Sequence, residues 1–197
     1  MHSLKQDLSW SGAGIQFCHD KKSLKAGLGK ISVKENLVVQ EFITGEDVGV
    51  EALFHQGQLI TYNAAKILDY FETKFTCTTR RIYFRNQEIE KLLTTLGESV
   101  GLNGFASISY MYEPNQHKYY LIKVDTRLNN WMPYSHFTGH GFSEGISRII
   151  KAGINPVEIS TVQPEDLSKE IEIALFYRDL VATKEKCEFH HDFRRIF

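Results

Sequence analysis

The sequence has 197 residues, of which 42% are hydrophobic and 24% charged, and its formal net charge is −1 at pH 7. These values are typical of one folded domain or of two closely packed lobes, and they exclude a disordered chain and a fibrous repeat. A charge so close to zero excludes an overall positive field, so we expect no nucleic-acid partner and only local anion sites.

Cysteine usage and hydropathy favour the cytoplasm. The three cysteines are widely spaced and form no CxxC pair, so the sequence encodes neither a disulfide framework nor a cysteine zinc site. No segment approaches the roughly 20 consecutive apolar residues that cross a bilayer, and Met1–Gln6 lacks the charged and apolar regions of a signal peptide. We therefore expect a cytoplasmic protein without a membrane partner.

The N-terminal residues are expected to form two short strands and a helix. Leu4–Leu8 and Ile15–Cys18 flank a turn of small residues at Ser9–Gly14, which is typical of a β-hairpin. Asp20 can cap the segment that follows, Lys21–Lys30, in which apolar residues interleave with lysines. This pattern predicts a short basic helix.

A β-rich region follows. Leu37–Ile43 is a compact run of β-formers that ends before Gly45. Asp47–Phe54 alternates apolar residues with small or acidic ones, and Leu59–Lys66 continues beyond a turn at Gly57. The three segments predict an antiparallel meander.

The second half of the chain combines helices with a hairpin. Asn86–Gly101 has apolar residues at helical spacing and ends in glycine. Gly104–Tyr112 and Tyr119–Val124 alternate as two paired strands, and further helices are expected at Phe142–Ala152 and Pro164–Tyr177. Together these elements predict an α+β fold.

Two segments of the first half carry groups suited to a nucleotide. Glycines in the turn after Lys5 let backbone N–H groups approach phosphate, and the ammonium adds positive charge, although an ordinary turn has the same sequence. Gln40–Ile43 offers groups at a strand end for an adenine edge, and Glu46 can accept hydrogen bonds from ribose hydroxyls. A buried strand followed by an acidic surface turn remains the other interpretation.

The end of the predicted hairpin carries a charged strip. Strand alternation places Lys123, Asp125 and Arg127 on one face and Ile122 and Val124 on the other. Asp125 can offer oxygen to Mg²⁺, and Arg127 can hold a phosphate or a carboxylate with two hydrogen bonds. A solvent-exposed strip of salt bridges is the alternative.

The histidines of the loop beyond this strip allow two interpretations. His136 and His140 have the spacing of helical metal ligands, but the glycines on either side of His140 favour a loop. The loop comprises Leu128–Phe142, whose aromatic side chains can line a substrate pocket or pack against the sheet. Core packing is the preferred interpretation for Trp131 within it.

Taken in order, these segments resemble the ATP-grasp superfamily, particularly the carboxylate-amine ligases and the ATP-binding part of carbamoyl-phosphate synthase. Lys5–Ile15 is similar to the family's lysine-proline strand and glycine-rich phosphate loop, and Val38–Glu51 to its adenine-binding hinge and ribose-binding acid. Gly104–Arg127 is similar to its terminal metal-binding hairpin, which usually ends in Glu-x-Asn-Pro-Arg. The resemblance implies two small lobes of antiparallel sheet with packed helices.

The resemblance also implies roles for individual residues. Lys5 would contact ATP phosphates, Glu46 the ribose, and Arg127 the transferred phosphoryl group or the acyl phosphate. Further phosphate candidates are Lys66 and Lys74. The residues implied for the mobile lid are Ser11, Gly12 and Gly14, and those implied for the adenine site are Gln40, Glu41, Phe42 and Ile43.

The sequence departs from the family pattern in both phosphate and metal motifs. Gln6 stands where the family has proline, and Asp125 and Thr126 stand for its Asn-Pro. Lys123 takes the place of a metal-bridging glutamate, and the ligand of the preceding strand falls on Ser109. A protonated ammonium repels Mg²⁺ and offers no lone pair. Asp125 is therefore the remaining candidate for the ion.

We expect a nucleotide-binding domain at 1–155, with a small lobe at about 1–45 and a large lobe at about 46–155, and a helical or extended segment at 156–197. The family's N-terminal α/β domain is missing, so we expect a homodimer or a partner chain that supplies it. The implied function is activation of a small carboxylate by ATP and Mg²⁺ as an acyl phosphate, which an amine attacks. The alternatives are a non-catalytic nucleotide-binding or interaction module, one part of a split enzyme, and a structural protein without a ligand.

Overall fold

The computed structural model describes residues 2–6, 14–29, 36–71, 77–138, 141–153 and 170–175. The chain divides into two compact units. Unit 1 comprises residues 1–44, 69–79 and 175–197, and unit 2 comprises residues 45–68 and 80–174. Ser11, Gly12, Lys74 and His140 lie outside the described residues.

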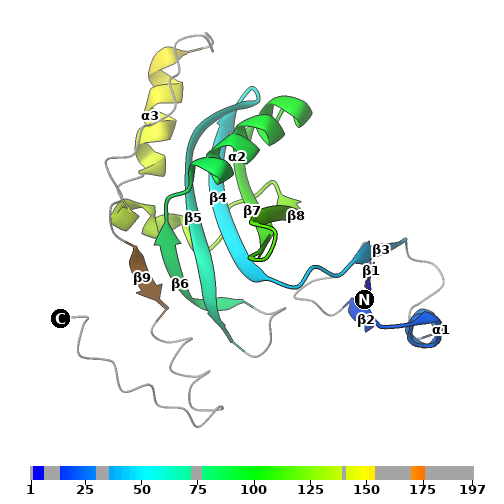
Figure 1. Cartoon of the computed structure of the whole chain (residues 1–197). Helices are drawn as coiled ribbons and strands as arrows, with labels where there is room; N and C mark the ends of the chain where they lie inside the picture. Colours follow the sequence, from blue (N-terminus) through cyan, green and yellow to red (C-terminus); the bar gives the residue numbers. More distant parts are fainter. Residues whose placement is uncertain are drawn as a thin grey trace, which may run out of the picture. The chain divides into compact units, whose positions relative to one another are not determined.

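Unit 1 contains a three-stranded antiparallel sheet (Figure 1). Its strands β1 (His2–Gln6), β2 (Ile15–Cys18) and β3 (Leu37–Glu41) lie in the order β2-β1-β3. The buried side chains of Leu4 and Cys18 form the small core of this sheet. The hairpin expected at the N-terminus is confirmed where its strands are described.

Helix α1 (Lys21–Leu28) follows the hairpin and begins at the residue expected to cap it. Asp20 Oδ1 accepts a hydrogen bond from the backbone N–H of Ser23 at 2.7 Å, and Ser23 Oγ accepts one from the N–H of Asp20 at 3.0 Å. This reciprocal pair satisfies two backbone donors that the first turn would leave open.

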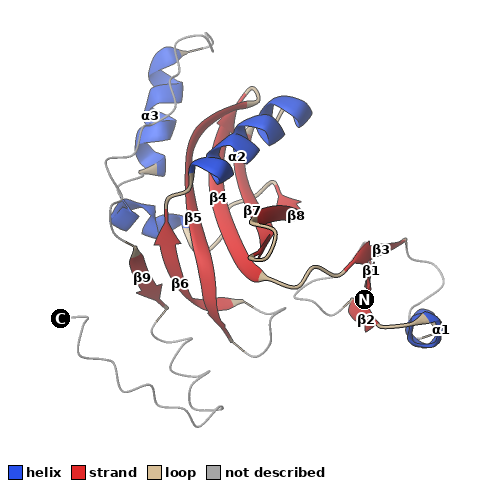
Figure 2. Ribbon diagram, in the orientation of Figure 1, coloured by secondary structure: helices blue, strands red, loops and turns tan. Residues whose placement is uncertain are grey.

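Unit 2 is built on a six-stranded sheet with strand order β8-β7-β4-β5-β6-β9 (Figure 2). Its strands are β4 (Glu46–His55), β5 (Gln58–Tyr70), β6 (Thr78–Phe84), β7 (Gly104–Glu113), β8 (Lys118–Asp125) and β9 (Ile171–Ala174). The β4–β5 and β7–β8 pairs are antiparallel hairpins, as the sequence predicts. The expected three-segment meander is wrong, because β3 pairs with β1 in the other sheet and not with β4. Strand β6 was not anticipated.

The two faces of this sheet are covered by different helices. Helix α2 (Gln87–Val100) lies along one face in Figures 1 and 2, where Ile89 and Leu93 pack with Val50 and Ile108. Helix α3 (Phe142–Ala152) and the 3₁₀ helix η1 (Met132–Thr138) pack through apolar residues around Leu53, which points to the opposite face. The helix expected at 142–152 is confirmed, whereas η1 replaces an expected loop.

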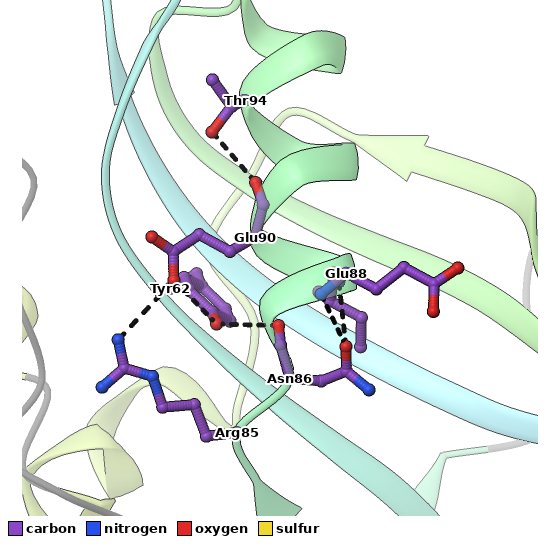
Figure 3. Close-up of polar contacts among 7 residues, drawn as sticks. Tyr62, Arg85, Asn86, Glu88, Glu90 and Thr94 are labelled. Carbon is purple, nitrogen blue, oxygen red and sulfur yellow. Dashed lines mark hydrogen bonds and ion pairs between the residues drawn. The ribbon is translucent and has the colours of Figure 1, made fainter.

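Polar contacts fix the start of α2 against β5 (Figure 3). Asn86 caps the helix, since its Oδ1 accepts hydrogen bonds from the N–H groups of Glu88 and Ile89. The Tyr62 hydroxyl donates to the Asn86 carbonyl at 3.2 Å. Burial, followed by the negative charge of Glu90, raises the pKa of Tyr62 to about 12. The sheet side chain and the helix start thus form one polar contact.

Helix α2 also touches the β4–β5 turn without an intervening side chain. A Cβ atom on Gly97 would collide with the carbonyl oxygen of Gly57 and lie 2.8 Å from the Phe54 ring. The Gly57 N–H donates to the Leu102 carbonyl at 2.8 Å, beyond the end of the helix. Glycine at position 97 therefore permits this close approach.

The prediction of one helix is wrong in the part of it that the structure describes. Residues 164–177 were expected to be helical, but Ile171–Ala174 forms β9, paired antiparallel with β6. The isoleucines at 171 and 173 flank Glu172, a period-two pattern that favours a strand once a partner is available. Residues 164–169, 176 and 177 lie outside the described residues. No helix among the described segments has the length and apolarity to cross a membrane.

Candidate functional site

The predicted nucleotide residues of unit 1 lie on its three-stranded sheet. Lys5 Nζ donates to Gln40 Oε1 at 2.6 Å, across neighbouring strands β1 and β3. The carbonyl of Gly14 accepts from the Gln6 N–H at 3.1 Å, which closes the end of the hairpin. Beyond β3, the Phe42 ring packs edge-on against Phe17. Lys5, Gln40 and Gly14 are thus held by one sheet.

The remaining predicted residues belong to unit 2. Glu46 and Lys66, expected at the ribose and at phosphate, form an ion pair of 2.7 Å between β4 and β5. Both side chains are partly exposed. This pair lies at the Glu46 end of β4, and Asp125 and Arg127 lie at the end of β8 or just beyond it.

Strand pairing brings polar and small residues into two rows on the sheet face opposite α2. Residues paired across antiparallel strands share a face, so each row can be read from the register. The first row runs from β5 to β8 through Asn63, Glu51, Ser107 and Asp125. The second row runs parallel to it through Ala65, Gly49, Ser109 and Lys123.

A bulge keeps the charged strip in these rows. The register of β7 with β8 shifts after Ser109, so that Tyr110 pairs with Leu121 and Ile122 is the extra residue. Lys123 and Asp125 consequently face the same side as the two serines of β7. The expected common face of Lys123 and Asp125 is thus present.

Two cations share one carboxylate oxygen in this strip. Lys123 Nζ lies 2.7 Å from Asp125 Oδ2, and Arg127 Nη2 lies 3.3 Å from the same atom. Arg127 also donates through Nη1 to the Leu128 carbonyl at 3.3 Å. The Lys123 and Arg127 side chains are 56% and 64% exposed, and that of Asp125 is 25% exposed. Both cations therefore present further donors to solvent.

These residues do not fit a Mg²⁺ ion. Magnesium binds oxygen ligands, usually one or two carboxylates together with substrate phosphates, and the only carboxylate of the strip already accepts an ammonium. The residues of β7 that pair with Asp125 and Lys123 are Ser107 and Ser109, which offer hydroxyl groups and no carboxylate. Over the part of the chain that is described, no three His, Cys, Asp or Glu side chains gather as a metal site.

Glu51, in the first row, belongs to a buried ion pair that was not expected from the sequence. Arg81, on β6, donates through Nη1 to Glu51 Oε1 at 2.8 Å, and the Glu51 side chain is 1% exposed. Asn129 Nδ2 donates to the same oxygen at 2.7 Å and to Ser107 Oγ at 2.9 Å. The available signal was Glu51 inside the apolar run of β4, because a charged residue there is rare without a buried partner. Arg81 gave no such signal, since it follows Arg80 in a strand that was not anticipated.

Trp131 closes this group of contacts. Its backbone N–H donates to Asn129 Oδ1 at 2.8 Å, and its ring lies 4.4 Å from the Arg81 guanidinium carbon. A Cβ atom on Gly49 would lie 3.1 Å from Arg81 Nη1, so glycine there leaves room for the guanidinium. The predicted packing role of Trp131 is confirmed, since the residue is buried. The segment after β8 is thereby attached to the sheet.

Comparison with known proteins identifies the fold. No family model matches the sequence, and no curated protein matches it. The biotin carboxylase domain of Hydrogenobacter thermophilus 2-oxoglutarate carboxylase matches at 15% identity and a TM-score of 0.59, over 79% of this chain and 37% of that one. Carboxyaminoimidazole ribonucleotide synthase from Aspergillus clavatus matches at 11% identity and a TM-score of 0.58, over 83% and 44%. L-amino acid ligase from Bacillus licheniformis matches at 17% identity and a TM-score of 0.50, over 70% and 36%.

This chain has an ATP-grasp-like fold of antiparallel sheets and packed helices, as its sequence predicts. It spans less than half the length of each of the three matched structures. At these identities the likeness concerns the fold and carries no residue's role with it.

Proposed function

We propose that this chain is the nucleotide-binding region of an ATP-grasp-type ligase, comprising residues 1–155, with lobes at about 1–45 and 46–155. The reaction would activate a small carboxylate with ATP as an acyl phosphate, which an amine then attacks. One matched structure holds MgADP, ADP and bicarbonate, and another holds ATP, which supports a nucleotide as the ligand of this fold.

The observation that carries the proposal is the charged strip on the polar face of the six-stranded sheet. Lys123 lies opposite Ser109 on β7, and among the described residues both Lys123 and Arg127 have donors that no carboxylate accepts. A planar guanidinium suits the oxygens of a phosphoryl group or an acyl phosphate, because it donates two parallel hydrogen bonds. Negative charge developing on the transferred group is stabilised by such fixed donors.

The other predicted residues are assigned the following roles in this proposal. Lys5 would contact phosphate oxygens, and Gln40, which accepts its hydrogen bond, would orient the ammonium. Glu46 would accept hydrogen bonds from the ribose, with Lys66 as its neighbouring cation. Gly14 and the adenine-lining residues Glu41, Phe42 and Ile43 complete the proposed set, together with Ser11 and Gly12.

A second function is favoured by one specific contact. Lys123 forms an ion pair with Asp125, the remaining candidate ligand for Mg²⁺. A ligase that depends on Mg²⁺ would therefore not hold the ion at this position. A non-catalytic nucleotide-binding module, or one part of a split enzyme, would retain the anion-binding cations without the metal. ATP consumption in the presence of candidate carboxylates and amines separates this function from the ligase.

Calorimetric titration with a non-hydrolysable ATP analogue tests the shared part of both functions. We expect the full chain to bind and Arg127→Ala to weaken binding about tenfold or more, because a charge-assisted hydrogen bond contributes about 1.5–3 kcal/mol. Arg148→Ala is the matched control, since Arg148 is a surface arginine of α3 that pairs with Glu144. Equal affinities for the two variants would contradict the role of Arg127.

A further inference from the structure

The charged strip has more cationic side chains than carboxylates. Two cations, Lys123 and Arg127, share the single charge of Asp125, so the strip has an excess of one positive charge. Its other row neighbours, Ser107 and Ser109, are uncharged. The next carboxylate along the row, Glu51, accepts hydrogen bonds from Arg81 and Asn129 and is buried. The local charge therefore attracts anions.

The remaining donors point to an oxyanion with several oxygens. An ammonium has three N–H donors and a guanidinium has five. Lys123 uses one contact with Asp125, and Arg127 uses one with Asp125 and one with the Leu128 carbonyl. Since both side chains are more than half exposed, the donors that no described residue accepts can reach a ligand in solvent.

A divalent cation would meet unfavourable contacts at the same place. To reach Asp125 Oδ2 it has to displace an ammonium at 2.7 Å, and the guanidinium 3.3 Å from that oxygen remains as a second positive charge. The hydroxyls of Ser107 and Ser109 are poor compensation, because Mg²⁺ prefers anionic oxygen. A metal ion and Lys123 are thus alternatives at this site.

We propose that the strip of Lys123, Asp125 and Arg127 is a metal-independent binding site for a polyphosphate, in which the Lys123 ammonium takes the place of a divalent cation. This inference rests on the proposed nucleotide function and specifies how the phosphate chain is held. Asp125 orients both cations, and the oxyanion accepts hydrogen bonds from them directly. Added Mg²⁺ neutralises part of the polyphosphate charge and does not strengthen its binding.

Titration of the full chain with inorganic tripolyphosphate and with a non-hydrolysable ATP analogue, each in EDTA and in Mg²⁺, tests the proposal. In EDTA both probes are expected to bind the unsubstituted chain, and Mg²⁺ is expected to leave affinity unchanged or to lower it. Lys123→Met should weaken binding in EDTA about tenfold, which is the effect of losing about 1.4 kcal/mol. Lys123→Glu should bind only with Mg²⁺, because it adds a carboxylate beside Asp125.

Lys118→Glu is the matched control. Lys118 lies on the same strand, and its ammonium contacts the Tyr120 ring outside the strip. We expect it to keep metal-independent binding. Because Lys123 is an exposed side chain, we expect its variants to fold. Circular dichroism of each variant checks this.

The outcomes distinguish the two proposals. Binding of the unsubstituted chain that Mg²⁺ strengthens tenfold or more, or binding in EDTA that Lys123→Met leaves unchanged, overturns the inference and leaves the nucleotide function standing. If tripolyphosphate binds without Mg²⁺ and the ATP analogue binds no more tightly than tripolyphosphate, the anion site is supported and the nucleotide function is contradicted. No binding of either probe overturns the site.

Discussion

Glu51 and Asp125 lie in one row across the six-stranded sheet, two strands apart, and each forms an ion pair with an arginine. Their surroundings differ. The Glu51 and Arg81 side chains are 1% and 8% exposed, whereas those of Asp125 and Arg127 are 25% and 64% exposed. The same pair of chemical groups is therefore enclosed in one place and open to solvent in the other.

This difference in exposure separates an ion pair that stabilises the fold from one that can bind a ligand. Glu51 Oε1 accepts from both Arg81 and Asn129, while Oε2 is buried and has no hydrogen-bond partner among the described residues. A buried carboxylate in this position depends on its arginine, because an unpaired buried charge is strongly destabilising. Exposed pairs contribute about 0–1 kcal/mol, so Asp125 is free to serve binding.

The largest expected effect breaks the enclosed pair. Arg81→Leu should lower the free energy of unfolding by about 3–5 kcal/mol, because Glu51 stays buried without its main countercharge. Urea denaturation followed by circular dichroism measures the change. Arg80→Leu is the control on the same strand, since Arg80 forms a partly exposed pair with Glu172 and should cost about 1 kcal/mol or less.

A double substitution sharpens this result. Replacing Glu51 with methionine together with Arg81→Leu removes both charges and should recover most of the lost stability. If the double variant is no more stable than Arg81→Leu, the loss arises from packing against Trp131 and Gly49, and the electrostatic account is wrong.

An intermediate effect concerns the opposite face, where tyrosines meet α2. Because the pKa of Tyr62 is raised to about 12 from 10.0, the folded state favours the protonated hydroxyl. Its contribution to stability is complete below about pH 10 and is lost as pH rises toward 12, since the unfolded chain loses the proton first. Tyr62→Phe should cost about 1 kcal/mol at neutral pH and reduce the alkaline loss.

Urea midpoints at pH 7 and pH 11 measure this dependence. Tyr120→Phe is the control, because the Tyr120 hydroxyl bonds to the exposed Gln116 on the β7–β8 hairpin. Burial raises the pKa of Tyr110 and of Tyr119 to about 12 as well, so Tyr62→Phe should remove only part of the alkaline loss. An unchanged difference between the two midpoints would contradict a role for Tyr62.

The smallest expected effect on stability belongs to the open pair. Asp125→Asn should change the free energy of unfolding by about 1 kcal/mol or less, because both of its cations are exposed. The same urea experiment measures it. A loss near that of Arg81→Leu would show that the strip holds the fold, and the contrast between the two pairs would disappear.

Elements whose signals are local could be predicted from the sequence alone. Helix α2 begins at the Asn86 cap and ends at Gly101, which has a φ of 65°. The β7–β8 hairpin and the common face of Lys123 and Asp125 follow from alternation over a few residues. Capping, helical spacing and strand periodicity each act between near neighbours, so no knowledge of distant contacts was needed.

Elements and contacts that depend on distant partners could be recognised only once the chain was folded. Ile171–Ala174 is a strand because β6 pairs with it, although its apolar residues also suited a helix. Glu51 meets Arg81 and Asn129 across separations of 30 and 78 residues. Neither contact has a local signature, because the side chains meet only after strand order and register have placed their strands on one face. The competition of Lys123 for Asp125 was visible in the sequence as a substituted motif, but the shared oxygen was not.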